Sequence, residues 1–252
     1  MKKLILIVLL LFVVYLVMEI YCRRPDQFKI TKLDIPSDTQ TLVLLFHGAK
    51  GHLNPELKAL ATQFKIYLGS NQNTEVINYN WSFASNNRLR ASTNAMKIGE
   101  FLGSEIANLK VLKNIRLIGH SVGAFIPDTL CQTYRDRGGD AHIEINFLDP
   151  FSLRGFADMS YGVRSHGKCA DFASSTMNTD DPAPTTNTML KNAWNLDVTS
   201  LDRPLDFKRS SHYWPPLYFL LSMNEDMARM GLKTHKEFPR GEIIQAVELS
   251  NK

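Results

Sequence analysis

The stretch LIGHSVGAF, residues 117–125, sets a serine between two glycines at the end of an apolar run. Residues 114–120 have the length and apolar character of a buried strand, and helical sequence follows the serine. Gly119 and Gly123 carry no Cβ, so they relieve the crowding of a sharp turn between a strand and a helix. The pattern predicts that this turn holds the hydroxyl of Ser121 out of the sheet, at the N-terminus of a helix.

The motif G-x-S-x-G alone is a weak signal, because about one chain in ten of this length would carry it by chance at average glycine and serine usage. The strand before it and the helix after it supply the context that gives the motif its meaning. In such a turn the N–H of Val122 points toward the position of an oxyanion, and the helix dipole favours negative charge there. We therefore predict that Ser121 is a nucleophile, against the alternative that it only caps a helix.

The sequence on both sides of this turn alternates between strand-like and helix-like segments. Apolar strands separated by helices argue for an α/β fold, with a mainly parallel sheet and helices on both of its faces. The strand-like segments are residues 41–47, 74–81, 114–120, 142–149, 170–178 and 193–198, and the helix-like segments are residues 54–69, 87–109, 121–137 and the C-terminal sequence from about 213.

Polar residues stand at the ends of three of these predicted strands, at His47, Ser121 and Asp149. The crossovers of a parallel sheet are right-handed, and ligands collect at the carboxyl ends of its strands. We therefore expect the functional site at that edge of the sheet.

A serine hydroxyl needs a base to take its proton, and an acid must hold that base. Of seven histidines, His212 lies in RSSHYWPP, a polar turn after the sheet strands that enters an aromatic segment able to fix the ring. We predict that His212 is the base, against the alternative of a histidine in a surface loop. The other six fit different roles: His47 shapes a loop, His120 points away from the serine inside the turn, His52, His142 and His166 lie in polar loops or at a strand start, and His235 lies on a solvated face.

Two positions compete for the acid. Asp149 ends the strand that follows the serine unit, and Pro150 after it would stop that strand. Asp180 and Asp181 follow the next strand, in a run that also reads as an exposed turn. Position alone leaves this choice open.

The N-terminal residues 1–24 form a separate hydrophobic segment, and residues 25–252 form a single catalytic domain. Two lysines precede an apolar run from Leu4 to Met18, but the bulky residues before Cys22 make a poor cleavage site. We favour an uncleaved signal-anchor over a cleaved signal, so the protein is expected to be membrane-anchored or exported.

Composition and motif spacing limit the partners and cofactors that we expect for this chain. A net charge of +4 without a dense basic stripe gives no support for nucleic-acid binding. No CxxC or HExxH spacing is present, so no metal site is expected. Cys131 and Cys169 could form a disulfide in an oxidising compartment or stay as two buried thiols, and both alternatives stay open.

Four segments resemble the pancreatic-type lipases of the α/β-hydrolase superfamily. LLFHGAKG resembles the family's His-Gly loop at a strand end, LIGHSVGAF its nucleophile turn and NFLDPF its Leu-Asp-Pro; residues 76–102 resemble its second strand and long helix. The likeness covers residues 42–151, and SSHYWPPLYF resembles the histidine segment only loosely. The family's C-terminal β-sandwich and framework cysteines have no counterpart in this chain.

The resemblance implies an α/β-hydrolase fold with Ser121 as nucleophile, Asp149 as acid and His212 as base. It also implies that the N–H of Ala49 joins that of Val122 in an oxyanion hole. We expect a hydrolase of carboxylic esters, acting on an ester or lipid substrate without a cofactor. The alternatives are an inactive lipase-like binding protein and an acyl hydrolase of another class, an amidase or thioesterase.

Overall fold

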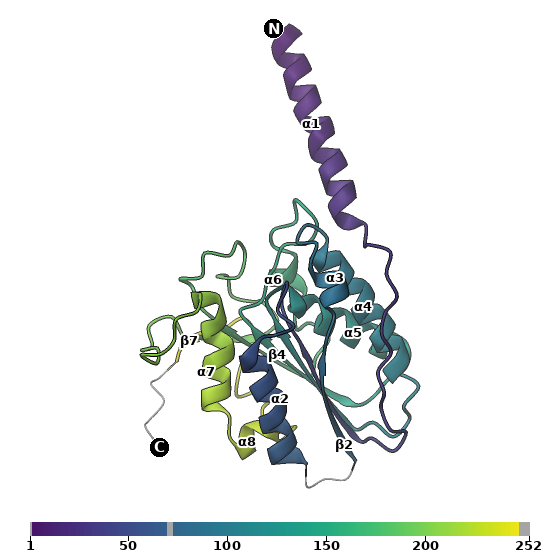
Figure 1. The fold of residues 1–252 in the computed structure, drawn as a ribbon, viewed down its shortest axis with the longest axis vertical. Coiled ribbons are helices and arrows are strands. Elements are labelled where there is room, and N and C mark those ends of the chain that lie inside the picture. Colours follow the sequence, from purple (N-terminus) through teal and green to yellow (C-terminus); the bar gives the residue numbers. More distant parts are fainter. Residues whose placement is uncertain (1, 70–72, 247–252) are drawn as a thin grey trace.

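The computed structural model describes residues 2–69 and 73–246. The chain forms a seven-stranded parallel sheet. Helices flank this sheet, and one long helix, α1 (Lys2–Arg23), projects from the domain (Figure 1). The predicted α/β class, with a mainly parallel sheet and helices on both faces, is confirmed. Residues 3–23 are long and apolar enough to be a membrane anchor or a signal.

The sheet has the strand order β2-β1-β3-β4-β5-β6-β7, and every neighbouring pair is parallel. The chain runs outward from β1 to β2 and then crosses back to β3 on the other side of β1, which is where ligands commonly bind in such sheets. The strands are β1 (Thr41–Phe46), β2 (Thr74–Tyr79), β3 (Asn114–His120), β4 (His142–Leu148), β5 (Phe172–Met177), β6 (Trp194–Asp197) and β7 (Ile243–Gln245).

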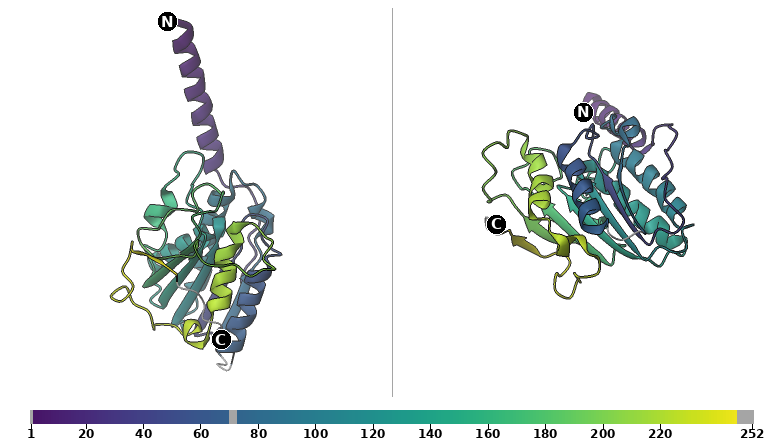
Figure 2. Two further views of the ribbon diagram at one scale, coloured as in Figure 1. Left: turned by 90° about the vertical axis from the view of Figure 1, so that its left-hand side faces the viewer. Right: turned by 60° about the horizontal axis from the view of Figure 1, so that its bottom comes forward.

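Alternation along the strands builds a core on each face of the sheet. In β1, Leu42, Leu44 and Phe46 join one apolar cluster, whereas Val43 and Leu45 join the other. The first cluster is covered by α4 (Ala91–Ile106) and α5 (Phe125–Asp136), and the second by α2 (Pro55–Leu68), α7 (Trp214–Ser222) and α8 (Glu225–Ala228) (Figure 2).

The C-terminal region differs from the prediction of helical sequence. Helices α7 and α8 form, but the chain after Ala228 is irregular and ends in β7, which pairs with β6 at the edge of the sheet. Gly231, Pro239 and Gly241 interrupt any helix there, and pairing with β6 selects a strand that only the assembled sheet can offer. The long helix predicted over residues 87–109 is shorter, with the separate turn α3 (Ser82–Ser85) before it.

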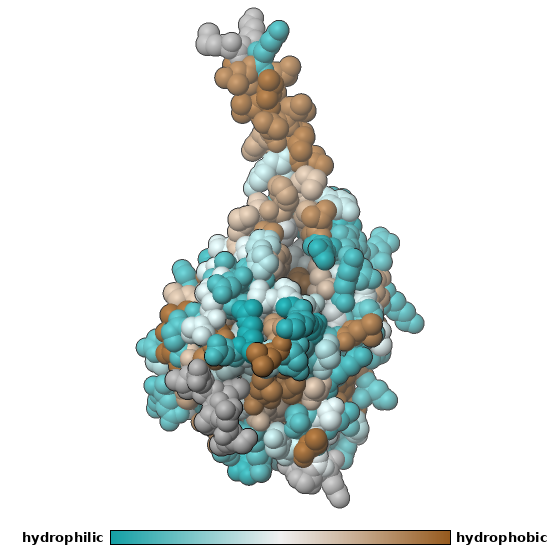
Figure 3. Space-filling model, turned by 60° about the vertical axis from the view of Figure 1, so that its left-hand side comes forward, coloured by the Kyte–Doolittle hydropathy of each residue, from teal (hydrophilic) through white to brown (hydrophobic). Residues whose placement is uncertain are grey.

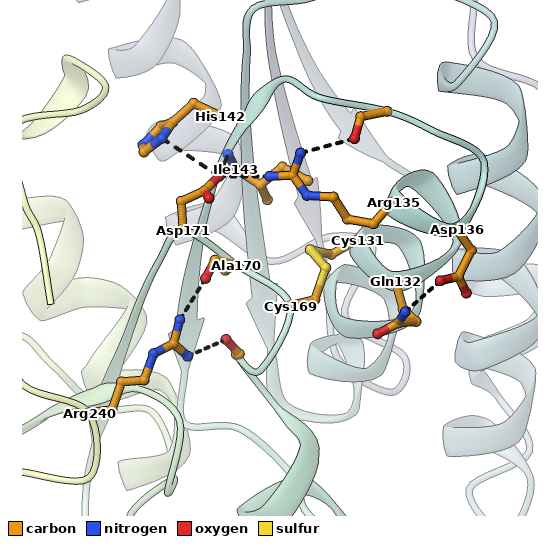
Figure 4. Close-up of a disulfide and its surroundings, with 12 residues drawn as sticks. Cys131, Gln132, Arg135, Asp136, His142, Ile143, Cys169, Ala170, Asp171 and Arg240 are labelled. Carbon is orange, nitrogen blue, oxygen red and sulfur yellow. Dashed lines mark hydrogen bonds and ion pairs between the residues drawn. A yellow bond between two sulfur atoms is a disulfide. The ribbon is translucent and has the colours of Figure 1, made fainter.

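Cys131 and Cys169 form a disulfide, which decides between the two alternatives for these cysteines. It ties α5 to the loop before β5, after the short helix α6 (Tyr161–Ser165) (Figure 4). Beside it, Arg135 pairs with Asp171 at 2.7 Å. The third cysteine, Cys22, is a buried free thiol.

Candidate active site

Ser121 lies in a strained turn between β3 and α5. Its φ is +57°, a left-handed conformation that is unfavourable for a residue with a side chain, and a short 3₁₀ turn, Ser121–Ala124, leads into the helix. A Cβ on Gly123 would lie 2.5 Å from the carbonyl oxygen of His47, and one on Gly119 would lie 2.8 Å from Cα of Ala124. Close approach of backbone therefore requires glycine on both sides of the serine.

The loop after β1 packs against this turn. A Cβ on Gly48 would lie 2.8 Å from Cβ of Ser121, so glycine lets the loop come up to the serine. Next to these residues, the N–H groups of Ala49 and Val122 donate to no hydrogen bond among the described residues. Both donors stay available for a developing negative charge near the serine hydroxyl.

His212 is held by two carboxylates. Its Nδ1 lies 2.7 Å from Oδ2 of Asp149 and 2.8 Å from Oδ2 of Asp181. Both acids are buried, whereas Asp180 is exposed. The two strand positions that compete in the sequence thus meet at one imidazole, because β4 and β5 are neighbours and their carboxyl ends share an edge.

Hydrogen bonds from Asn178 and Thr186 fix the acids and the histidine loop. The N–H of Asn178 donates to Oδ1 of Asp149 at 3.0 Å, and its side-chain amide donates to the carbonyl of Ser211 at 3.1 Å. The hydroxyl of Thr186 donates to Oδ2 of Asp181 at 2.5 Å. One asparagine therefore links the end of β5 to Asp149 and to the backbone just before His212.

Burial and hydrogen bonding set the charges of this group. Burial raises the pKa of Asp149 to about 7, although His212 opposes the shift. Burial acts in the same direction on Asp181, but hydrogen bonds from His212 and Thr186 outweigh it and lower the pKa of Asp181 below its usual range. Burial lowers the pKa of His212, but hydrogen bonds to the two acids outweigh burial and raise it to about 9.

His120, which the sequence places inside the turn, contacts His212. Its ring lies 4.7 Å from the ring of His212, centroid to centroid, and its Nε2 donates to the carbonyl of His212 at 3.2 Å. Burial lowers the pKa of His120 well below its usual value, so the ring stays neutral. His120 is thus a buried support for His212, and its place beside the serine in the motif was the only signal for it.

His47 and His235 also make structural contacts. His47 shapes its loop, as predicted: Nδ1 contacts the carbonyl of Gly48 at 2.7 Å, and Nε2 accepts the N–H of Trp81 at 3.1 Å. His235 is not on a solvated face, because it is half-buried and its Nε2 accepts the N–H of Ala173 at 3.1 Å.

No hydrogen bond joins the hydroxyl of Ser121 to the ring of His212 within the described residues. The two residues share the carboxyl edge of the sheet, where His120 directly precedes the serine and its ring lies against that of His212 at a tilt of 37°. Catalytic hydrogen bonds in ligand-free enzymes are often long and tighten when substrate binds.

The same three side chains have the spacing of a metal-ligand set. One atom each of Asp149, Asp181 and His212 lies within 4.8 Å of the others. The contacts of 2.7 and 2.8 Å to Nδ1 are hydrogen-bond lengths, so the set as it stands is a hydrogen-bonded cluster. In this cluster, two carboxylates hold one imidazole through its Nδ1.

No model of a known protein family matches the chain, and a search of curated proteins finds no similar sequence.

Proposed function

We propose that the protein is a serine hydrolase of carboxylic esters, built on an α/β-hydrolase fold and related to the pancreatic-type lipases. One observation carries the proposal: a buried acid holds the imidazole of His212 at 2.7 Å, on the sheet edge where a strained turn presents Ser121. A strained nucleophile and an acid-held imidazole are the parts that acyl transfer requires.

In the proposed reaction, His212 takes the proton of Ser121 as the hydroxyl oxygen attacks the ester carbonyl. The N–H groups of Ala49 and Val122 donate to the oxyanion, and each such donor is typically worth about 3–4 kcal/mol. Asp149 holds the imidazole in the tautomer that accepts at Nε2. His212 then protonates the departing alcohol, and a water activated in the same way releases the acid.

Lipid is the favoured substrate class because the resemblance and the apolar N-terminal helix both point to it. The disulfide between Cys131 and Cys169 supports an oxidising compartment, which agrees with a membrane-anchored or exported protein.

The test is covalent labelling of the full chain, in detergent micelles, with a fluorophosphonate probe. We expect the native chain to be labelled and Ser121→Ala not to be labelled, because the probe reacts with an activated serine. Equal labelling of the two would contradict the assignment of the nucleophile, and labelling of neither would favour a lipase-like binding protein. Esters of graded chain length, with matched amides and thioesters, then identify the acyl class.

A further inference from the structure

Helix α1 stands clear of the domain along nearly its whole length. Figure 3 shows its apolar surface rising from a surface of mixed polarity, and its most apolar stretch is not buried against the domain. The 21 residues from Lys3 to Arg23 form an α-helix about 31 Å long. The apolar run before Glu19 accounts for about 22 Å of this length, and Lys3 at its far end can extend to the opposite headgroups of a bilayer whose hydrocarbon core is about 30 Å thick. The helix leaves from the end of the molecule where the strands have their carboxyl ends (Figure 1).

The base of this helix is bonded to the loop that follows Asp149. The carboxylate of Glu19 accepts the N–H groups of Phe156 at 2.8 Å and Ala157 at 2.9 Å, and it also pairs with Arg23. Higher on the helix, the ring of Tyr15 contacts that of Phe156, with 6.2 Å between centroids.

A second set of contacts binds the helix end to α4. Cys22 is fully buried, and its carbonyl accepts the hydroxyl of Thr93 at 3.1 Å. The guanidinium of Arg90 lies 3.8 Å above the ring of Tyr21 and donates to Asp26 at 2.9 Å. Loss of the segment by cleavage near Cys22 would remove these contacts, so we treat residues 19–26 as a joint that belongs to the domain.

The edge around this joint is apolar and carries cationic groups. Apolar side chains in the segments that follow the strand ends are exposed, at Leu53, Phe83, Leu89, Phe156, Met159 and Leu205. A cleft of about 480 Å³ beside the joint is lined by Arg23, Lys97 and Arg154, with Glu100 as the acid among its charged residues. Apolar groups with cations next to a spanning helix match a bilayer surface with anionic headgroups.

We infer that α1 remains attached and, through the joint of residues 19–26, holds the carboxyl edge of the sheet against the bilayer that α1 spans. The loop 151–159 then lies at the level of the lipid headgroups. If the proposed function is correct, the ester is drawn from this same membrane rather than from solution.

The first experiment measures contact with lipid and does not depend on catalysis. The full chain is placed in phosphatidylcholine vesicles, with and without phosphatidylglycerol, and a fluorophore is attached at Met159→Cys or, as a control, at Ile66→Cys. Ile66 is also exposed but lies in the last turn of α2, at the opposite end of the sheet. We expect quenching by headgroup spin-labelled lipid at position 159 and not at position 66; equal quenching at both would overturn the inference.

Glu19→Gln tests whether the joint fixes the orientation. It weakens the bonds to the N–H groups of Phe156 and Ala157 without touching the site. We expect the variant to co-float with vesicles in a density gradient as the native chain does, because α1 is intact. We expect its quenching at position 159 to be reduced. Unchanged quenching would mean that the helix is only a tether, and an intact mass that begins near residue 25 would show that α1 is removed.

A separate experiment tests whether the ester is drawn from the membrane. Met159→Ser should lower hydrolysis of a long-chain ester in vesicles about tenfold, since one buried apolar side chain is worth about that factor, and leave hydrolysis of a soluble short-chain ester unchanged. Ile66→Ser should change neither. If all variants hydrolyse both esters as the native chain does, the membrane is not the source of the substrate. If the native chain hydrolyses neither ester but is still quenched by lipid at position 159, the proposed function is wrong and the contact with the membrane is still supported.

Discussion

The backbone of Ser121 carries a conformational cost that its neighbours impose. A φ of +57° is held by the close packing of the loop after β1 against residues 119–123. Left-handed φ costs a residue with a Cβ about 1 kcal/mol or more, and strain of this kind concentrates at functional sites. The position thus costs the fold some stability.

Replacing the serine by glycine should release this strain. We expect Ser121→Gly to be more stable than Ser121→Ala by about 1 kcal/mol, because alanine keeps the unfavourable φ and glycine does not. Thermal unfolding of both variants measures the difference, which corresponds to about 2–4 °C in Tm for a domain of this size. Equal stability would show that the turn is not strained; both variants should be inactive.

The two acids at His212 predict an alkaline pH profile. The base must be neutral to act, and the pKa of His212 is raised to about 9 by its hydrogen bonds to Asp149 and Asp181, which outweigh burial. We therefore expect kcat/KM to rise with pH through about 9. A profile that is already flat above pH 7 would contradict the arrangement.

Removing one acid at a time separates their roles. Asp149→Asn should lower kcat/KM by about 10³- to 10⁴-fold, as loss of the triad acid does elsewhere. Asp181→Asn should move the pH profile to lower pH with a smaller loss at high pH, because one of two groups that raise the pKa of His212 is gone. Asp180 is exposed, so Asp180→Asn is the matched control and should change neither kcat/KM nor its pH profile. If Asp181→Asn is the crippling change and Asp149→Asn is mild, Asp181 is the acid.

At the scale of elements, the disulfide couples α5, which begins beside the nucleophile, to the loop that leads into β5. The bond closes a loop of 38 residues in sequence separation. Restricting the unfolded chain in this way stabilises a fold by about 4 kcal/mol in the chain-entropy model.

We expect Cys131→Ser to lower the free energy of unfolding by about 2–4 kcal/mol, as judged by denaturant unfolding. Reduction of the native chain should have a similar effect, and the variant should then be insensitive to reductant. Equal stability with and without reductant in the native chain would mean that this bond does not contribute to the fold.

At the scale of the whole molecule, the boundary predicted between residues 24 and 25 cuts through packed contacts. Glu19, Tyr21 and Cys22 belong in sequence to the apolar segment but contact the domain. Chains that begin at residue 19 and at residue 25 should therefore differ in stability.

The shorter chain should be less stable by about 2 kcal/mol, since it loses buried Cys22 and charge-assisted bonds that are each worth about 1.5–3 kcal/mol before exposure is considered. Thermal unfolding of the two truncated chains gives the comparison. Equal Tm values would show that the joint does not contribute to the stability of the domain.

The sequence by itself determined the parallel sheet, the covering helices and the turn at Ser121. Periodicity and glycine placement are local properties, and the apolar runs of β1, β3 and β4 are long enough to specify buried strands. It also singled out His212, Asp149 and Asp181, which the structure brings into contact, because polar residues near strand ends are visible in the order of the chain.

Only the tertiary structure decided how those residues meet. That Asp149 and Asp181 share one imidazole depends on the side-by-side placement of β4 and β5, and the strand β7 depends on pairing with β6. Three other features also join positions that are distant in sequence: the contact of His120 with His212, the disulfide, and the bonds of Glu19 to the loop after β4. Such contacts form only when the sheet has assembled, since the pattern within one segment carries no information about its partner.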